Sequence, residues 1–173
     1  MGCSPVQAAR TSSTEVLKPS SWARYETISV EKAVPLVLDS LQKSIAALRS
    51  VVAKANDEAF MSALDEVAQN AIKSGVIQHF EFTYELCWKS MKRWIETNVS
   101  ATQADGVTRR ELFRQAAEQR LIDDIEQWMR YHAARNKTSH TYEPAVAESV
   151  YQVTNLFLHD AELLLEALAA RND

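Results

Sequence analysis

A chain of 173 residues with 46% apolar and 24% charged residues is long enough for one domain with a single hydrophobic core. Three glycines and four prolines are too few for the tight turns of a β-rich fold, so the composition predicts an all-α domain. A net charge of −4 argues against a general nucleic-acid coating protein, which neutralises phosphate with an excess of basic residues.

The sequence also indicates a reducing, cytoplasmic location. Cys3 and Cys87 are the only cysteines, and two cysteines so placed form neither a disulfide framework nor a zinc motif. Val6 stands where N-myristoylation requires serine or threonine. No apolar run reaches the roughly 18 residues of a membrane span, and the N-terminus lacks a signal-peptide core, so no membrane partner is expected.

Residues 1–28 are expected to form a flexible N-terminal extension, partly docked through Trp22 and Tyr25, and residues 29–173 a helical bundle domain. The first helix should begin near Pro35, because apolar residues then recur every three or four positions. They are Val34, Val37, Leu38, Leu41, Ile45, Leu48 and Val52.

A second apolar stripe runs from Phe60 to Ile95, after Asn56 and Asp57, either of which could cap a helix. Its phase continues through Gly75, which favours one long helix, with a kink at Gly75 as the alternative. A helix of that length needs partners along its whole surface, so the stripe predicts a bundle or a dimer interface.

Three further helices complete the expected bundle. Thr108 and Glu111 read as a capping box that opens a short helix through Leu121, after a polar connection over residues 98–107. Asp123 and Asp124 suit the start of the next helix.

Pro144 suits the first turn of the last helix, whose apolar residues extend to Leu168. We therefore predict an antiparallel up-and-down bundle of four to five helices.

No metal site is expected. His79, His132 and His159 each stand alone at helical positions and are best interpreted as ordinary structural histidines. His132 and His140 lie eight residues apart, which is not a zinc-ligand spacing, and no acidic residue completes a set with them.

The segment RNKTSHTY, residues 135–142, differs from the rest because it gathers several kinds of polar side chain just before a proline. On an ideal helix Asn136 and His140 lie about 40° apart and share a face, whereas Arg135 and His140 diverge by about 140°. For both to contact one phosphate, the helix must unwind near Ser139, or a second copy of the chain must supply the missing side chain.

The residue types suit RNA cleavage without a metal. Arginine holds phosphate with a planar, permanently charged fork, and histidine titrates near neutral pH and can move a proton to or from a ribose hydroxyl. The alternative is a plain helix C-terminus, with Arg135 and Lys137 placed for the helix dipole and His140 as a cap.

RNKTSHTY resembles the R-x4-H-x-Y motif of the HEPN superfamily, in its HepT-like branch. The stretch VIQHFEFTYELCWKSMKRW, from Val76 to Trp94, resembles the long helix of the nucleotidyltransferase substrate-binding proteins of that branch. The likeness covers roughly residues 25–170. Cys87 departs from it mildly, since a small residue such as alanine is expected there.

The resemblance implies a two-fold homodimer in which the arginine and histidine of both copies meet, and a minimal nucleotidyltransferase as hetero-oligomeric partner. It implies a metal-independent endoribonuclease toxin, without cofactor, that the partner silences by transferring AMP to Tyr142. Arg135 would bind phosphate, Asn136 would orient the site and His140 would be the acid–base group, with Lys137 and Ser139 near the RNA substrate. The alternative is a non-catalytic subunit that presents a substrate to the nucleotidyltransferase.

Overall fold

A computed structural model of the chain describes residues 1–2, 36–99, 106–140 and 143–172, with the side chain of His140 excepted. The chain divides into two compact units, residues 1–32 and 33–173, and every helix below belongs to the second unit. The expected extension of residues 1–28, with Trp22 and Tyr25, lies outside the described residues apart from the first two.

The first helix, α1 (Asp39–Ala55), buries the predicted stripe through Leu41, Ile45, Leu48 and Val52. It begins four residues after Pro35, which itself is not described. Leu36 precedes it outside any helix, because both its backbone groups pair with one side chain. The N–H of Leu36 donates to Asn172 Oδ1 at 2.6 Å, and its carbonyl accepts from Asn172 Nδ2 at 2.8 Å.

The prediction of one helix from the Asn56–Asp57 cap to Ile95 was wrong at its start. Asp57 does cap a helix, but this helix, α2 (Glu58–Ser62), is only five residues long. The side chain of Asp65 accepts from Ala68 N at 2.8 Å and opens a new helix. Gln69 donates to the carbonyls of Met61 and Leu64, so the break between the two helices is stabilised by side-chain hydrogen bonds.

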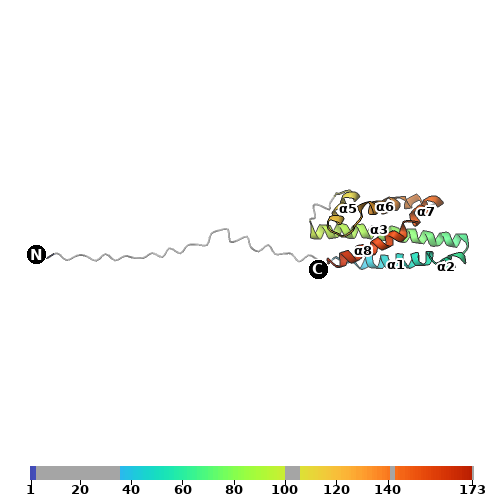
Figure 1. Cartoon of the computed structure of the whole chain (residues 1–173), viewed down its shortest axis with the longest axis horizontal. Coiled ribbons are helices and arrows are strands. Elements are labelled where there is room, and N and C mark those ends of the chain that lie inside the picture. The colour runs from blue at the N-terminus through green and yellow to red at the C-terminus, as the bar shows by residue number, and fades with distance from the viewer. Residues whose placement is uncertain (3–35, 100–105, 141–142, 173) are drawn as a thin grey trace. The chain divides into compact units, whose positions relative to one another are not determined.

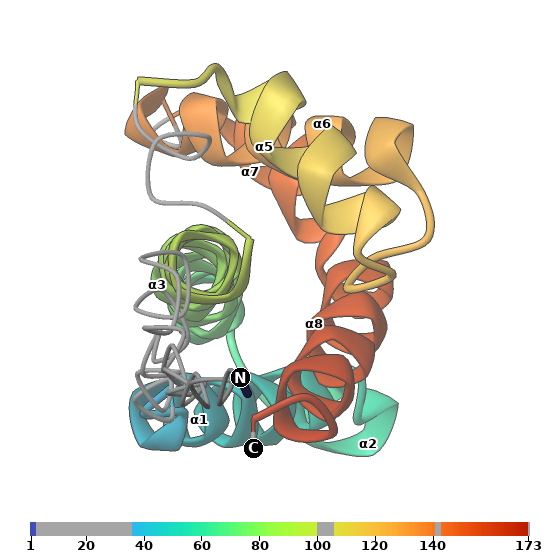
Figure 2. The same cartoon turned by 90° about the vertical axis from the view of Figure 1, so that its left-hand side faces the viewer.

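The new helix, α3 (Glu66–Asn98), is 33 residues long and continues through Gly75 without a break, as favoured. It contacts α1, α5, α6, α7 and α8, so it is the common partner of the bundle (Figure 1). In the end-on view, α3 lies between α1 and the α5–α6 pair, with α8 at the side (Figure 2).

Helix α5 (Arg109–Glu118) begins at the predicted cap, where Thr108 Oγ1 accepts from Glu111 N at 3.2 Å. The capping box is only half formed, because the Glu111 carboxylate pairs with Arg114 instead. The helix ends three residues before Leu121, where Arg120 takes a left-handed conformation with φ of 55°. Two backbone hydrogen bonds close this end in the Schellman pattern.

The remaining helices complete an antiparallel path (Figure 1). Helix α6 (Ile125–Lys137) begins at the Asp124 cap, and α7 (Pro144–Tyr151) has Pro144 in its first turn, both as predicted. The single last helix predicted from the sequence is interrupted at Gln152 and Val153, after which α8 (Thr154–Ala169) resumes.

The prediction of an all-α fold is confirmed, with more helical segments in the described residues than the four or five expected. A cluster of aromatic rings joins α3, α6 and α8 at the centre. Phe157 packs edge-on against Phe80, Trp128 and Tyr131, with centroid distances of 4.9, 6.1 and 5.1 Å. In the part of the chain that is described, no helix is long and apolar enough to cross a membrane.

The left-handed Arg120 gives a stability prediction. A side chain in this conformation costs about 1–2 kcal/mol, which glycine avoids at a smaller entropic cost. Arg120→Gly should therefore raise the free energy of unfolding by about 0.5–1 kcal/mol in urea denaturation. Arg130→Gly, an exposed position inside α6, is the matched control and should lower it by about 1 kcal/mol. A loss of stability in Arg120→Gly would contradict the assignment of strain to this residue.

Candidate functional site

The segment RNKTSHTY lies at a change of helix type. Arg135, Asn136 and Lys137 form the last turn of α6, and Thr138–His140 form a 3₁₀ turn. The carbonyl of Arg135 accepts both the backbone N–H and, at 2.8 Å, the hydroxyl of Thr138, which closes the helix end. The α-helix ends at Lys137, two residues before Ser139, and such an end is one of the two arrangements that the helical wheel left open for Arg135 and His140.

Arg135 is held by two carboxylates of the long helix α3. Its Nη2 lies 3.4 Å from Glu81 Oε1, and its Nε lies 2.8 Å from Glu85 Oε1. The second contact is an ion pair without an aligned hydrogen bond, because the buried Nε–H does not point at an acceptor. The Arg135 side chain remains 34% exposed. This half-open position keeps the guanidinium oriented and still within reach of a ligand.

Asn136 belongs to a different contact, a short chain of polar groups that extends into the bundle. Its Nδ2 lies 3.4 Å from His132 Nε2, and His132 Nδ1 lies 2.9 Å from the hydroxyl of Tyr84, which is fully buried. The imidazole also stacks on the Tyr84 ring, with an interplanar angle of 26°. Asn136 is thus supported from α3 through His132.

Burial, together with the positive charges of Arg109 and Arg135, holds the pKa of His132 below its ordinary value, against the opposing effect of Glu85. The imidazole is therefore neutral at pH 7, with one nitrogen able to accept a hydrogen bond. Burial raises the pKa of the Tyr84 phenol far above its usual range, so this hydroxyl keeps its proton.

The other predicted site residues are only partly placed. Lys137 and Ser139 are exposed to solvent close to Arg135 in the sequence. The Ser139 hydroxyl lies 3.5 Å from the carbonyl of Asn136. The predicted catalytic side chain of His140 and the predicted modification site Tyr142 lie outside the described residues.

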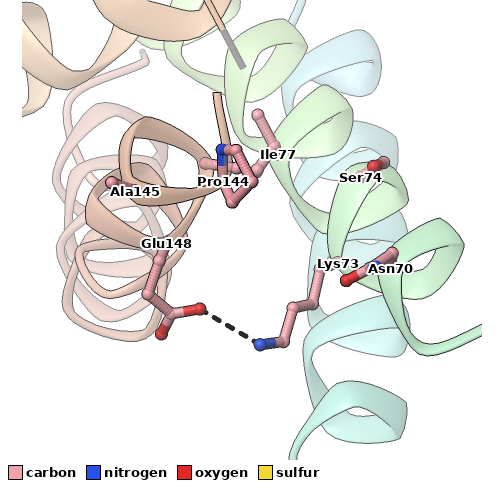
Figure 3. Close-up of a pocket in the computed structure, with 8 residues that line it drawn as sticks. Asn70, Lys73, Ser74, Ile77, Pro144, Ala145 and Glu148 are labelled. Atoms are coloured by element: carbon pink, nitrogen blue, oxygen red, sulfur yellow. Dashed lines mark hydrogen bonds and ion pairs between the residues drawn. The ribbon is translucent and has the colours of Figure 1, made fainter. Parts of the chain in front are cut away.

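A cavity of about 550 Å³ lies between α3 and α7 (Figure 3). Pro144, two residues after Tyr142, is in its wall, opposite Asn70 and Ser74 of α3. Lys73 and Glu148 close one side of it with an ion pair of 3.1 Å. This volume is in the range of small-molecule sites.

Sequence reasoning missed the residues that hold the predicted ones in place. Glu81 and Glu85 bind Arg135, and Tyr84 with His132 supports Asn136. The spacing of four between Glu81 and Glu85, and between His132 and Asn136, was a usable signal, because residues four apart share a helix face. The sequence does not show that this face of α6 packs against α3, and for this reason it predicts only an isolated structural histidine at position 132.

Among the described residues, no group of three histidine, cysteine, aspartate or glutamate side chains is placed to hold a metal ion. The site in this part of the chain is defined instead by an arginine between carboxylates and by a neutral histidine.

The protein is an all-helical bundle in which Arg135, in the last turn of α6, is paired with two carboxylates of α3. Comparison with known proteins identifies its family. Residues 36–170 match the family model described as "nucleotidyltransferase substrate binding protein like". A relative from Haemophilus influenzae named probable ribonuclease HepT is 34% identical over 138 residues, which are 79% of this chain and 94% of the relative. The chain therefore belongs to the HepT-like family of nucleotidyltransferase substrate-binding proteins.

Solved structures agree with this fold. A structure from Haemophilus influenzae, described as the fold of a substrate binding domain of a nucleotidyltransferase, is 31% identical and superimposes with a TM-score of 0.75. The match covers 77% of this chain and 99% of that chain. A protein from Thermus thermophilus, 22% identical over 76% of this chain and 97% of that chain, shares the fold with a TM-score of 0.56.

The charges around His132 predict the direction of pKa changes. Removing the positive charge in Arg109→Gln should raise the pKa of His132, and removing the negative charge in Glu85→Gln should lower it further. NMR titration of the His132 imidazole measures both. Arg110→Gln, an exposed neighbour paired with Glu126, is the control and should leave the titration as in wild type. A fall in the His132 pKa in Arg109→Gln would refute this electrostatic account.

Proposed function

We propose that this protein is a metal-independent endoribonuclease whose site is built on Arg135 and His140. The observation that carries the proposal is the placement of Arg135. Two carboxylates orient this side chain, one third of it is exposed, and its helix ends two residues later at Lys137. A relative with 34% identity named probable ribonuclease HepT supports the same activity.

In the proposed reaction, Arg135 donates hydrogen bonds to the non-bridging oxygens of the scissile phosphate and exchanges part of its pairing with Glu81 and Glu85 for them. His140 accepts the proton of the ribose 2′-hydroxyl, and the 2′-oxygen attacks phosphorus. The bond to the 5′-oxygen breaks, and this oxygen takes a proton from water, which leaves a 2′,3′-cyclic phosphate and a 5′-hydroxyl. Asn136, supported by His132, orients the site, and Lys137 and Ser139 contact the flanking RNA.

The proposed enzyme is a homodimer in which each copy supplies part of the site. In it, the arginine of one copy and the histidine of the other face one phosphate, as the resemblance to the HepT-like branch implies. Phe82 lies on α3 next to Glu81 and is 53% exposed. An exposed large apolar side chain on α3 supports an interface on this helix, because exposed apolar surface gains free energy on contact.

Regulation is proposed to come from a minimal nucleotidyltransferase partner, the arrangement of a toxin–antitoxin pair. The family description as nucleotidyltransferase substrate binding protein supports such a partner. Transfer of AMP from ATP to the Tyr142 oxygen releases pyrophosphate and places a negatively charged group within the segment that binds RNA phosphate. Repulsion between the two phosphates would then silence the enzyme.

The histidine carries a direct prediction for RNA cleavage. His140→Ala should lower the cleavage rate of a labelled single-stranded RNA by about 10²- to 10⁴-fold, because proton transfer in the transition state is lost. His159→Ala, an exposed histidine of α8, is the matched control and should cut RNA as wild type does. Equal rates for wild type and His140→Ala would end the ribonuclease proposal.

The shared site can be tested with the same assay. Arg135→Gln and His140→Ala should each be inactive alone, whereas a mixture refolded together should recover part of the activity in mixed dimers. Persistent inactivity of the mixture would place both side chains in one copy.

A second candidate is the non-catalytic subunit that presents a substrate to the nucleotidyltransferase. The cavity of about 550 Å³ beside Pro144 favours it, because Lys73, Asn70 and Glu148 could hold a polar small molecule there. A solved relative described as a substrate binding domain of a nucleotidyltransferase also agrees with this role.

Labelled ATP separates the two candidates. When the pair is incubated with ATP labelled in the α-phosphate, the toxin proposal predicts label on this chain, lost in Tyr142→Phe and retained in the control Tyr151→Phe. Substrate presentation predicts label on an added small molecule and an unlabelled chain. Label that persists on Tyr142→Phe would contradict the assignment of the modified residue.

A further inference from the structure

Glu85 connects the Arg135 site to a second cavity. One carboxylate oxygen of Glu85 lies 2.8 Å from Arg135 Nε, and the other accepts a hydrogen bond of 3.0 Å from the indole nitrogen of Trp88. Trp88 lines a cavity of about 390 Å³ between α3, the beginning of α5, and α6. Its wall includes Lys92, Val107, Arg109, Leu112 and His132. The cavity and the Arg135 site are therefore neighbours on α3, and the carboxylate of Glu85 links a wall residue of the cavity to Arg135.

Arg109 is the unusual residue of this cavity. Its guanidinium carbon lies 3.5 Å from the centroid of the Trp88 ring, a close cation–π contact that orients it. Its buried Nε has no hydrogen-bond partner, and no carboxylate of the described residues forms an ion pair with it. A buried N–H without an acceptor costs free energy, so this group favours the binding of an acceptor.

The neighbouring arginines make the contrast clear. Arg110 pairs with Glu126, and Arg114 pairs with Glu111 and Glu118. Arg109 is the first residue of α5, where the helix dipole already concentrates positive charge and a basic residue is unfavourable. An anion bound at this point would offset both the unpaired charge and the dipole.

Arg109 and Arg135 are related through α3. Arg109 packs on the Trp88 ring, the Trp88 indole donates to Glu85, and Glu85 pairs with Arg135. Both positive charges also hold the pKa of His132, which lines the cavity, below its ordinary value.

We infer that the cavity between Trp88, Arg109 and His132 binds one nucleotide, with its phosphate on the Arg109 guanidinium and its base against the indole and the apolar side chains of Val107 and Leu112. A volume of about 390 Å³ suits such a ligand. Arginine with an aromatic ring is a frequent pair in the recognition of unpaired bases. This nucleotide belongs to an RNA strand, and the next phosphate of the strand lies at Arg135. The binding of a nucleotide does not rest on the proposed function, whereas its origin in RNA does.

Equilibrium binding tests the inference. The full chain carrying His140→Ala is titrated into a short, fluorescein-labelled single-stranded RNA at several salt concentrations. Arg109→Gln in this background should weaken binding at least about tenfold and reduce the slope of log K against log salt by about one, as for loss of one phosphate contact. Arg110→Gln removes the same charge one residue away and should change the affinity less than about twofold.

A second measurement observes the cavity directly. AMP and the same RNA are added separately to the isotope-labelled chain, and the indole N–H signal of Trp88 is followed by NMR. A shift with RNA that Arg109→Gln abolishes supports the RNA source, and a shift with AMP alone assigns the cavity to a free nucleotide.

An unmoved Trp88 signal with both ligands, or equal RNA affinities for Arg109→Gln and Arg110→Gln, would overturn the inference. RNA that binds normally but is not cut by wild type would sink the proposed ribonuclease activity and leave this binding site intact.

Discussion

The packing of α3 against five other helices is the constraint on which the rest of the structure depends. A helix of 33 residues in isolation exposes apolar side chains along its whole length, and here α1, α5, α6, α7 and α8 cover the row of them between Val76 and Ile95. Phe80, Tyr84, Cys87, Met91 and Ile95 are fully buried as a result. Because α3 is fixed in this way, the polar side chains on its remaining surface have fixed positions and can serve as a rigid support for a site on another helix.

Those polar side chains face the end of α6. Glu85 uses its two oxygens on Arg135 and Trp88, and Tyr84 supports His132 from the interior. A site supported by packed helices keeps its geometry better than one on loops, since each side chain is limited to few rotamers.

The sequence predicted what depends on local pattern and missed what depends on contact between helices. The helix starts marked by Thr108, Asp124 and Pro144 were predictable, because a helix start is decided by residues within one turn. The break at Asp65 was not, because the apolar stripe continues in phase across it. The pairing of Arg135 with Glu81 was also hidden, since 54 residues separate the two and no periodicity relates them.

The pair of hydrogen bonds between Leu36 and Asn172 has a consequence for how the chain can be rearranged. It joins the residues just before the first helix and just after the last one, although the two positions are 136 apart in the sequence. A short linker from Asn172 to Leu36 would connect these positions covalently. New ends could then be opened in the connection before α5, and the circularly permuted chain would keep every helix and every contact of α3.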